Sequence, residues 1–127
     1  MKMRYLQALV IFAVSYINAD VINISSLSQL QDIIAKNDFV VVKFYSDSCG
    51  PCRGFAPIYK AAAGDATFKS IVFVEVNAAY NQSIAAHYTI KSIPALHFYK
   101  NGQLKLAESG SKTSSQFRAL LNVYFPQ

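Results

Sequence analysis

Apolar and polar positions follow two different periods along this chain, and the change of period predicts alternating strands and helices. The run F-V-V-V-K-F-Y, residues 39–45, is almost continuously apolar, which suits a central strand covered on both faces. Over residues 113–124 the apolar positions instead fall on one stripe of a helix. The predicted strands are residues 21–24, 39–45, 71–77, 95–100 and 103–108. The predicted helices run from a cap at Ser25 or Ser26 to Lys36, from about 50 to 63, from about 81 to 88 and from about 113 to 124.

The order of these elements defines the expected fold class. The first three strands are joined through helices, so they should run parallel. Asn101-Gly102 is a strong signal for a tight hairpin, which pairs the last two strands antiparallel. The sequence therefore predicts an α/β fold in which a central mixed β-sheet is flanked by helices on both faces.

The beginning of the chain has the composition of an export signal. Residues 1–4 are basic, residues 5–17 are apolar and almost free of charge, and Ala19 places a small residue before Asp20. This order is typical of a secretory signal peptide, so we expect residues 1–19 to be removed.

An uncleaved membrane anchor and a buried N-terminal helix are the alternatives to cleavage. The apolar run is shorter than the roughly 20 residues that a spanning helix needs, and it carries the polar residues Gln7 and Ser15. Cleavage is favoured for this reason, and residues 20–127 are then the mature, exported domain, in a periplasm, a secretory lumen or outside the cell.

Charge and composition limit the kinds of protein that the mature chain can be. With 53% apolar residues, 127 residues suffice for one domain with a real core. Loss of Lys2 and Arg4 leaves 10 of the 12 basic residues against 7 acidic ones, a net charge of +3. The remaining lysines are scattered, so neither nucleic-acid binding nor stable membrane association is expected. Export also places the cysteines where disulfides persist.

Both cysteines of the chain, Cys49 and Cys52, lie in the stretch Y-S-D-S-C-G-P-C-R between a predicted strand and a predicted helix. Backbone N–H groups at the start of that helix stabilise a thiolate on Cys49, and Pro51 suits a first helical turn. Cys49 can then attack a substrate disulfide, and Cys52 can attack Cys49 to release the reduced substrate.

Zinc binding and a purely structural disulfide are the other interpretations of this pair. A zinc site needs four ligands, and the only histidines, His87 and His97, do not lie at ligand spacing. A structural disulfide gains little from closing so short a loop. The residues favour a redox pair, with no metal and no cofactor.

In these features the chain resembles the thioredoxin family over roughly residues 20 to 125. The resemblance rests on a strand followed by C-G-P-C and a helix, on Pro57, on the later Ile93-Pro94 and on the hairpin and last helix. It implies a thioredoxin fold, with Cys49 as the nucleophile and Cys52 as the resolving thiol. The intervening Gly50-Pro51 is the dipeptide of the reducing members.

The resemblance also implies a substrate groove. Pro94 should be a cis-proline that faces the cysteines, with the Ile93 backbone binding an extended substrate segment. Gly110 matches a glycine that lets the substrate approach. Ser48 stands where the family has a tryptophan, and an aromatic is retained at Tyr45, so substrate preference is open.

The most informative departure is Lys43, which replaces the family's buried carboxylate on the central strand. Glu75 lies on the neighbouring strand, where some relatives carry a lysine. Our hypothesis is that Lys43 and Glu75 pair beneath the cysteines and that Glu75 takes over proton handling. The alternative is that Lys43 extends outward and only packs.

The predicted function is that of an exported thioredoxin-like protein-disulfide reductase, monomeric, cycling between the dithiol and the disulfide of Cys49 and Cys52. Its partners would be protein disulfides and a reductant, either a thioredoxin reductase or a membrane electron donor. A disulfide oxidase or isomerase of similar fold and a non-catalytic partner-binding module are the alternatives.

Overall fold

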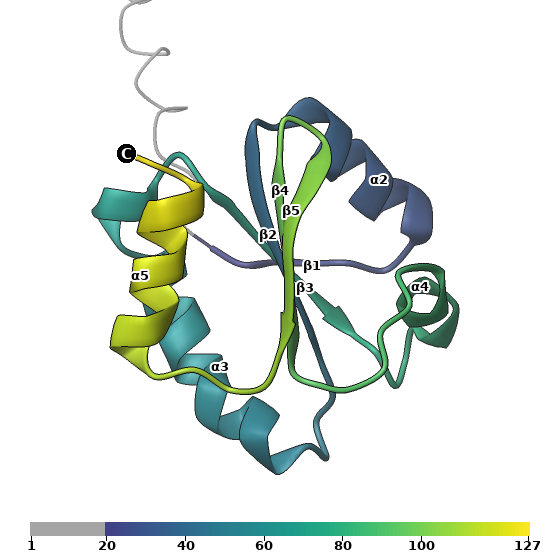
Figure 1. Ribbon diagram of the computed structural model, residues 1–127. Helices are drawn as coiled ribbons and strands as arrows, with labels where there is room; N and C mark the ends of the chain where they lie inside the picture. Colours follow the sequence, from purple (N-terminus) through teal and green to yellow (C-terminus); the bar gives the residue numbers. More distant parts are fainter. Residues whose placement is uncertain (1–19) are drawn as a thin grey trace, which may run out of the picture.

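A five-stranded sheet forms the centre of the computed structural model, which describes residues 20–127 (Figure 1). The predicted signal peptide lies outside the described residues. The strands are β1 (Ile22–Asn23), β2 (Phe39–Tyr45), β3 (Val72–Asn77), β4 (Ala95–Lys100) and β5 (Gln103–Ser109). The helices are α2 (Leu27–Lys36), α3 (Gly50–Ala63), α4 (Gln82–His87) and α5 (Ser114–Tyr124), with a short 3-10 helix, η2 (Ala66–Phe68).

The sheet is mixed, as the order of elements predicted. Its strand order is β1-β3-β2-β4-β5. β1 and β2 run parallel to β3, whereas β4 pairs antiparallel with β2, and β5 with β4. At the turn between β4 and β5, Asn101 and Gly102 have φ values of 53° and 81°, which is the geometry of a tight hairpin turn. The expected α/β class and hairpin are confirmed.

The ends of the strands and helices differ from the predicted ends by a few residues at most. For α2 and α5, the N-cap residue explains where the helix begins. Ser26 caps α2, because its hydroxyl oxygen accepts the backbone N–H of Gln29 at 3.2 Å. The first residue of the helix is therefore Leu27, directly after the cap. Thr113 and Gln116 form a reciprocal capping box that starts α5 at Ser114. The short helix η2 was not predicted, and β1 has only two residues.

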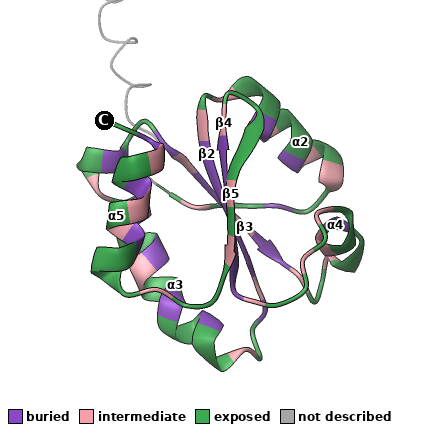
Figure 2. Cartoon of the chain, viewed as in Figure 1, coloured by how far each residue is buried: buried purple, intermediate pink, exposed green. Residues whose placement is uncertain are grey.

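Two apolar cores lie on opposite faces of the sheet. α3 and α5 cover one face, where Phe55 and Phe117 pack against Val41, and α2 and α4 cover the other. The strands β2, β3 and β4 are largely buried, while the edge strands β1 and β5 and the outer sides of the helices are largely exposed (Figure 2). Because β2 is buried on both faces, its sequence is apolar at every position except Lys43.

Three connections that carry predicted site residues meet at one end of the sheet. The segment after β2 carries the cysteines, the segment before β4 carries Pro94, and the segment after β5 carries Gly110. The parallel strand β3 ends beside β2, since Tyr45 and Asn77 are register partners. Among the described residues, no helix combines the length and the apolar character that a membrane crossing requires.

Candidate active site

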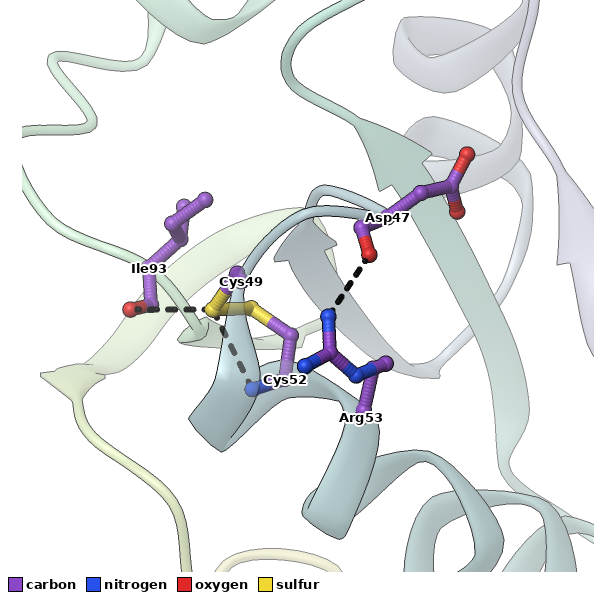
Figure 3. The surroundings of a disulfide bond; sticks show 5 residues. All are labelled: Asp47, Cys49, Cys52, Arg53 and Ile93. Carbon is purple, nitrogen blue, oxygen red and sulfur yellow. Dashed lines mark hydrogen bonds between the residues drawn. A yellow bond between two sulfur atoms is a disulfide. The ribbon is translucent and has the colours of Figure 1, made fainter.

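The cysteine pair lies where β2 gives way to α3. Cys49 is the N-cap residue of α3, and its sulfur accepts the backbone N–H of Cys52 at 3.1 Å (Figure 3). The two sulfurs are joined in a disulfide, so the structure is that of the oxidised form. Cys49 is partly exposed and Cys52 is buried, with 3% of its surface accessible. This is the asymmetry expected between an attacking and a resolving thiol.

The segment before β4 faces the disulfide. The Ile93–Pro94 peptide bond is cis, as the resemblance implied. The carbonyl oxygen of Ile93 lies 3.8 Å from the sulfur of Cys49 (Figure 3). Gly110 joins this group, because its N–H donates to the carbonyl of Pro94 at 2.8 Å and its φ of 99° is one that side chains rarely tolerate. The three segments that carry Cys49, Pro94 and Gly110 therefore lie next to one another.

Two residues that the sequence did not single out hold the segment before Cys49. Arg53 donates to the carbonyl oxygen of Asp47 at 3.1 Å, across the first turn of α3 (Figure 3). The side chain of Asn77, at the end of β3, lies 3.5 Å from the carboxylate of Asp47. The signal for Asn77 was its place at the carboxyl end of a strand parallel to β2. Ser48, in this same segment, is exposed.

Lys43 and Glu75 form an ion pair beneath the cysteine-bearing helix. Their side chains meet at 3.1 Å, with 4% and 20% of their surfaces exposed. They are register partners on adjacent strands and therefore share the sheet face that α3 covers. The expectation of a pair is confirmed, and the alternative, an outward-pointing Lys43, is wrong because a buried charge needs its counter-charge.

Aromatic rings complete the surroundings of this ion pair. The ammonium of Lys43 lies 4.9 Å from the ring centre of Tyr45 and 4.7 Å from that of Tyr59, which is the range of cation–π attraction. Burial raises the pKa of Tyr45, and the carboxylates of Glu75 and Asp47 raise it further. Tyr45, expected from the sequence to bind substrate, thus contacts Lys43 through its ring.

Tyr59 fixes this region to the sheet. Its hydroxyl lies 2.7 Å from the carbonyl of Val74 and 3.0 Å from that of Val41, so it bridges β3 and β2. Full burial raises the pKa of Tyr59 well above its usual value, which keeps the hydroxyl protonated as a donor. A cavity of about 350 Å³ lies beside it, with Ala56, Lys43 and Glu75 among its lining residues.

The histidines stand apart from the cysteines. His97 is buried on β4, 3.2 Å from the hydroxyl of Tyr99, and desolvation lowers its pKa. His87, at the end of α4, is exposed. Within residues 20–127, no three histidine, cysteine or acidic side chains gather as metal ligands would.

The sheet order, the cis-proline and the disulfide at a helix N-terminus define a protein of the thioredoxin fold. The sequence model of the family described as thioredoxin matches residues 21–123. The chain is 33% identical to a thioredoxin of Neurospora crassa over 90 residues, which are 70% of each chain. It is 31% identical to a thioredoxin of Mycoplasmoides gallisepticum over 99 residues, 78% of this chain and 97% of that one.

Solved structures agree with this assignment. A thioredoxin of Plasmodium falciparum superposes with a TM-score of 0.75 at 29% identity, covering 82% of this chain and 99% of that one. A thioredoxin of Trypanosoma brucei brucei gives a TM-score of 0.80 at 19% identity, over 90% of this chain and 98% of that one, and shows the shared fold. The chain belongs to the thioredoxin family. It is a thiol–disulfide oxidoreductase, a thioredoxin-like protein-disulfide reductase whose redox centre is the pair Cys49–Cys52.

Proposed function

We propose that this reductase passes electrons to disulfides of exported proteins, with Cys49 as the attacking thiol and Cys52 as the resolving thiol. The observation that carries the proposal is the placement of the disulfide at the N-terminus of α3, opposite the cis-Ile93–Pro94 bond. Cys49 is the more accessible of the two, so a substrate disulfide reaches its sulfur first.

The exchange begins from the reduced form of the pair. The Cys49 thiolate attacks one sulfur of the substrate disulfide, forming a mixed disulfide and expelling the other substrate sulfur as a thiolate, which takes up a proton. Cys52 then loses its proton, and its thiolate attacks Cys49. This step restores the intramolecular disulfide and releases the second substrate sulfur as a thiolate, which is also protonated. Two electrons have moved to the substrate, and a dithiol reductant returns them.

Backbone geometry supports these roles. The N–H of Cys52 points at the sulfur of Cys49, and the first turn of a helix offers N–H groups that stabilise a negative sulfur. Gly50 and Pro51 occupy that first turn, and Gly50 has no side chain that could cover Cys49. Proline costs no hydrogen bond there, because the first N–H groups of a helix have no partner within it.

Substrate binding is assigned to the three segments that surround Cys49. Ile93 presents its backbone carbonyl next to the sulfur, where an extended substrate segment can pair with it, and Pro94 and Gly110 line the approach. Ser48 leaves the other side of Cys49 open, since it is small and exposed. Tyr45 contributes indirectly, because its ring contacts the ammonium of Lys43 and helps to hold that side chain in place.

Glu75 is the acceptor for the Cys52 proton in this proposal, with Lys43 holding it in place. Both lie on the sheet face that α3 covers, and Ala56, one helical turn after Cys52, lines the same cavity as Lys43 and Glu75. The positive charge of Lys43 also favours a thiolate nearby. The family's single buried carboxylate is thus replaced by a carboxylate supported from the neighbouring strand.

Export, the electron donor and the monomeric state belong to the same proposal. Residues 1–19 have the order of charge, apolar run and small residue that leads to cleavage before Asp20. The reductant is a thioredoxin reductase or a membrane electron donor, whichever the compartment supplies. A monomer leaves the groove around Cys49 free for protein substrates.

Reduction of insulin by dithiothreitol tests the reductase function, with a matched pair of variants. The unaltered chain should accelerate the reaction, and Cys49→Ser should abolish the acceleration. Cys52→Ser should instead trap the substrate as a mixed disulfide on Cys49, visible by mass spectrometry. A protein that binds insulin without accelerating its reduction would be the non-catalytic module.

The redox potential of the Cys49–Cys52 couple separates a reductase from an oxidase. A value near about −270 mV, that of thioredoxin, supports the proposal. A value near about −120 mV, that of a strong disulfide oxidant, would contradict it and favour the oxidase alternative.

A further inference from the structure

Two asparagines of this chain stand two residues before a serine, in Asn23-Ile24-Ser25 and in Asn81-Gln82-Ser83. The pattern N-x-S, with any residue but proline in the middle, is the acceptor sequence for N-linked glycans in exported proteins. Neither copy contains a residue of the redox site described above. The folded structure distinguishes the two asparagines, because their side chains lie in different surroundings.

Asn23 has an exposed side chain on a well-held backbone. It lies in β1, both residues of which are exposed. Its carbonyl oxygen accepts the side-chain amide of Gln29 at 3.3 Å, and the N–H of the next residue, Ile24, donates to the carbonyl of Glu75 at 3.0 Å. Within residues 20–127, no hydrogen bond involves the side-chain amide of Asn23. A glycan can therefore be attached to that amide without breaking a contact of the described fold.

The position of β1 keeps such a glycan away from the substrate groove. β1 forms one edge of the sheet, and β3 separates it from β2. The segments that carry Cys49, Pro94 and Gly110 flank β2, β4 and β5, on the other side of β3. A glycan on Asn23 extends from the β1 edge and leaves the approach of protein substrates to Cys49 open.

The edge of the sheet at β1 also gains from a covering group. β1 pairs with β3 on one side, and no strand of the described part of the chain lies on its other side. Exposed edges of this kind can pair with other chains, and natural proteins protect them with charged residues or covering segments. Beside Asn23, the apolar side chain of Ile22 is 38% exposed. A bulky, hydrated oligosaccharide on Asn23 shields this edge and keeps the protein soluble.

Asn81 lies in less suitable surroundings for a glycan. Its side chain is half-buried, and its amide nitrogen donates to the carbonyl of Asn77 at 3.0 Å, which holds it against the loop before α4. The side chain of Asn77 in turn lies 3.5 Å from the carboxylate of Asp47, in the segment before Cys49. A glycan on Asn81 would stand beside the approach to the cysteines. The structure therefore favours Asn23 over Asn81.

We propose that Asn23 is an N-glycosylation site of the exported protein. The donor is an oligosaccharide linked to a lipid diphosphate. Nδ2 of Asn23 forms a bond to the anomeric carbon of the first sugar, and the bond from that carbon to the diphosphate oxygen breaks. The amide loses one proton, the lipid diphosphate leaves, and nothing is oxidised or reduced. The inference rests on the export included in the proposed function, and it adds that the compartment holds such a donor, as a secretory lumen does.

Production of the full chain in a eukaryotic secretory host tests the site. The secreted protein should carry a glycan on Asn23. Peptide N-glycosidase should remove it and convert the linked asparagine to aspartate, which peptide mass spectrometry locates at residue 23. Asn23→Gln and Ser25→Ala should each abolish this modification, and the matched control Asn81→Gln should keep it in full. A secreted chain that begins at Asp20 with Asn23 unmodified would overturn the inference, and so would a glycan that is lost only in Asn81→Gln.

The result for Asn23 can be told apart from failure of the proposed function. If residues 1–19 do not deliver the chain, export by this leader is contradicted. Residues 20–127, which contain both apolar cores, then decide the modification behind a leader of known function. The glycosylated protein and Asn23→Gln should reduce insulin at the same rate, because β1 lies apart from the cysteines. A glycosylated chain that fails to reduce insulin would contradict the reductase function and not the modification.

Discussion

Lys43 is the residue at which this chain departs most from its family. A charged side chain in a strand buried on both faces is unfavourable unless a counter-charge and other contacts satisfy it. Glu75 supplies the counter-charge at 3.1 Å, and the rings of Tyr45 and Tyr59 supply cation–π contacts. The arrangement keeps a carboxylate near the cysteine-bearing helix, although it projects from β3 instead of β2.

Glu75→Gln tests whether that carboxylate moves a proton. If Glu75 accepts the proton of Cys52, its loss should slow resolution of the mixed disulfide on the order of a hundredfold near neutral pH, the contribution typical of a positioned general base. The pH dependence of that step should change with it. Stopped-flow measurement of a single turnover follows the step directly.

The matched control for this experiment is Glu108→Gln. Glu108, near the end of β5, pairs with Lys112 at 3.1 Å, so its loss removes a carboxylate that is not beneath the cysteines. Its rate and pH profile should match those of the unaltered chain. An unchanged profile in Glu75→Gln would rule out the relay and leave Lys43 and Glu75 a structural pair.

At the scale of elements, a single ion pair joins the end of α3 to the last helix. Asp65, which follows α3, pairs with Arg118 on α5 and also accepts the N–H of Thr67 at 2.8 Å, which starts η2. The Arg118 guanidinium and the bonds from Thr67 lower the pKa of Asp65 to about 2. The two helices on this face of the sheet are thereby linked outside the apolar core.

This pair predicts a particular acid response. Because the folded pKa of Asp65 lies below its unfolded value of about 3.9, its contribution to stability is present above about pH 4 and is lost as pH falls toward 2. Arg118→Ala should lower the free energy of unfolding at pH 7, and the difference from the unaltered chain should shrink between pH 4 and 2. Urea unfolding at a series of pH values measures it.

Lys36→Ala serves as the comparison, since it removes an exposed ion pair with Asp32 inside α2 alone. Such pairs contribute little to stability, so this variant should unfold almost as the unaltered chain does at pH 7. A difference between Arg118→Ala and the unaltered chain that stays constant from pH 7 to 2 would mean that Arg118 acts by packing on Phe68, not by charge.

At the scale of the whole molecule, the active site is an assembly of segments that are distant in the chain. Cys49, Pro94 and Gly110 meet because β2 and β4 are neighbours and the segments flanking them converge at one end of the sheet. Asp20 and Val21, which precede β1, line the cavity beside Lys43 and Glu75.

Native mass spectrometry of the exported protein tests both export and oligomeric state. After enzymatic deglycosylation, we expect a single species with the mass of one chain that begins at Asp20 and contains one disulfide. A chain that keeps residues 1–19 and partitions with membranes would identify the uncleaved anchor. A dimer mass at micromolar concentration would contradict the monomer.

Much of the fold could be predicted from the sequence, because short-range patterns carry it. Periodicity located nearly every strand and helix, and the caps at Ser26 and Thr113 account for the differences at the helix starts. The strand predicted at residues 21–24 is present but shorter, as β1, and only η2, with three residues, was missed because it has too few positions for a period to emerge. Within the site, the cysteines and Ile93-Pro94 stood out because their spacing and residue types are themselves the signal.

The sequence by itself determined the elements, the mixed sheet and the redox pair, since periodicity, turn residues and a C-x-x-C at a helix start act over a few residues. Two features were decided only by tertiary structure: the choice between a Lys43–Glu75 pair and an outward-pointing Lys43, and the contacts of Arg53 and Asn77 with Asp47. These features depend on which strands and segments pack together, and that choice comes from burying both faces of the sheet at once.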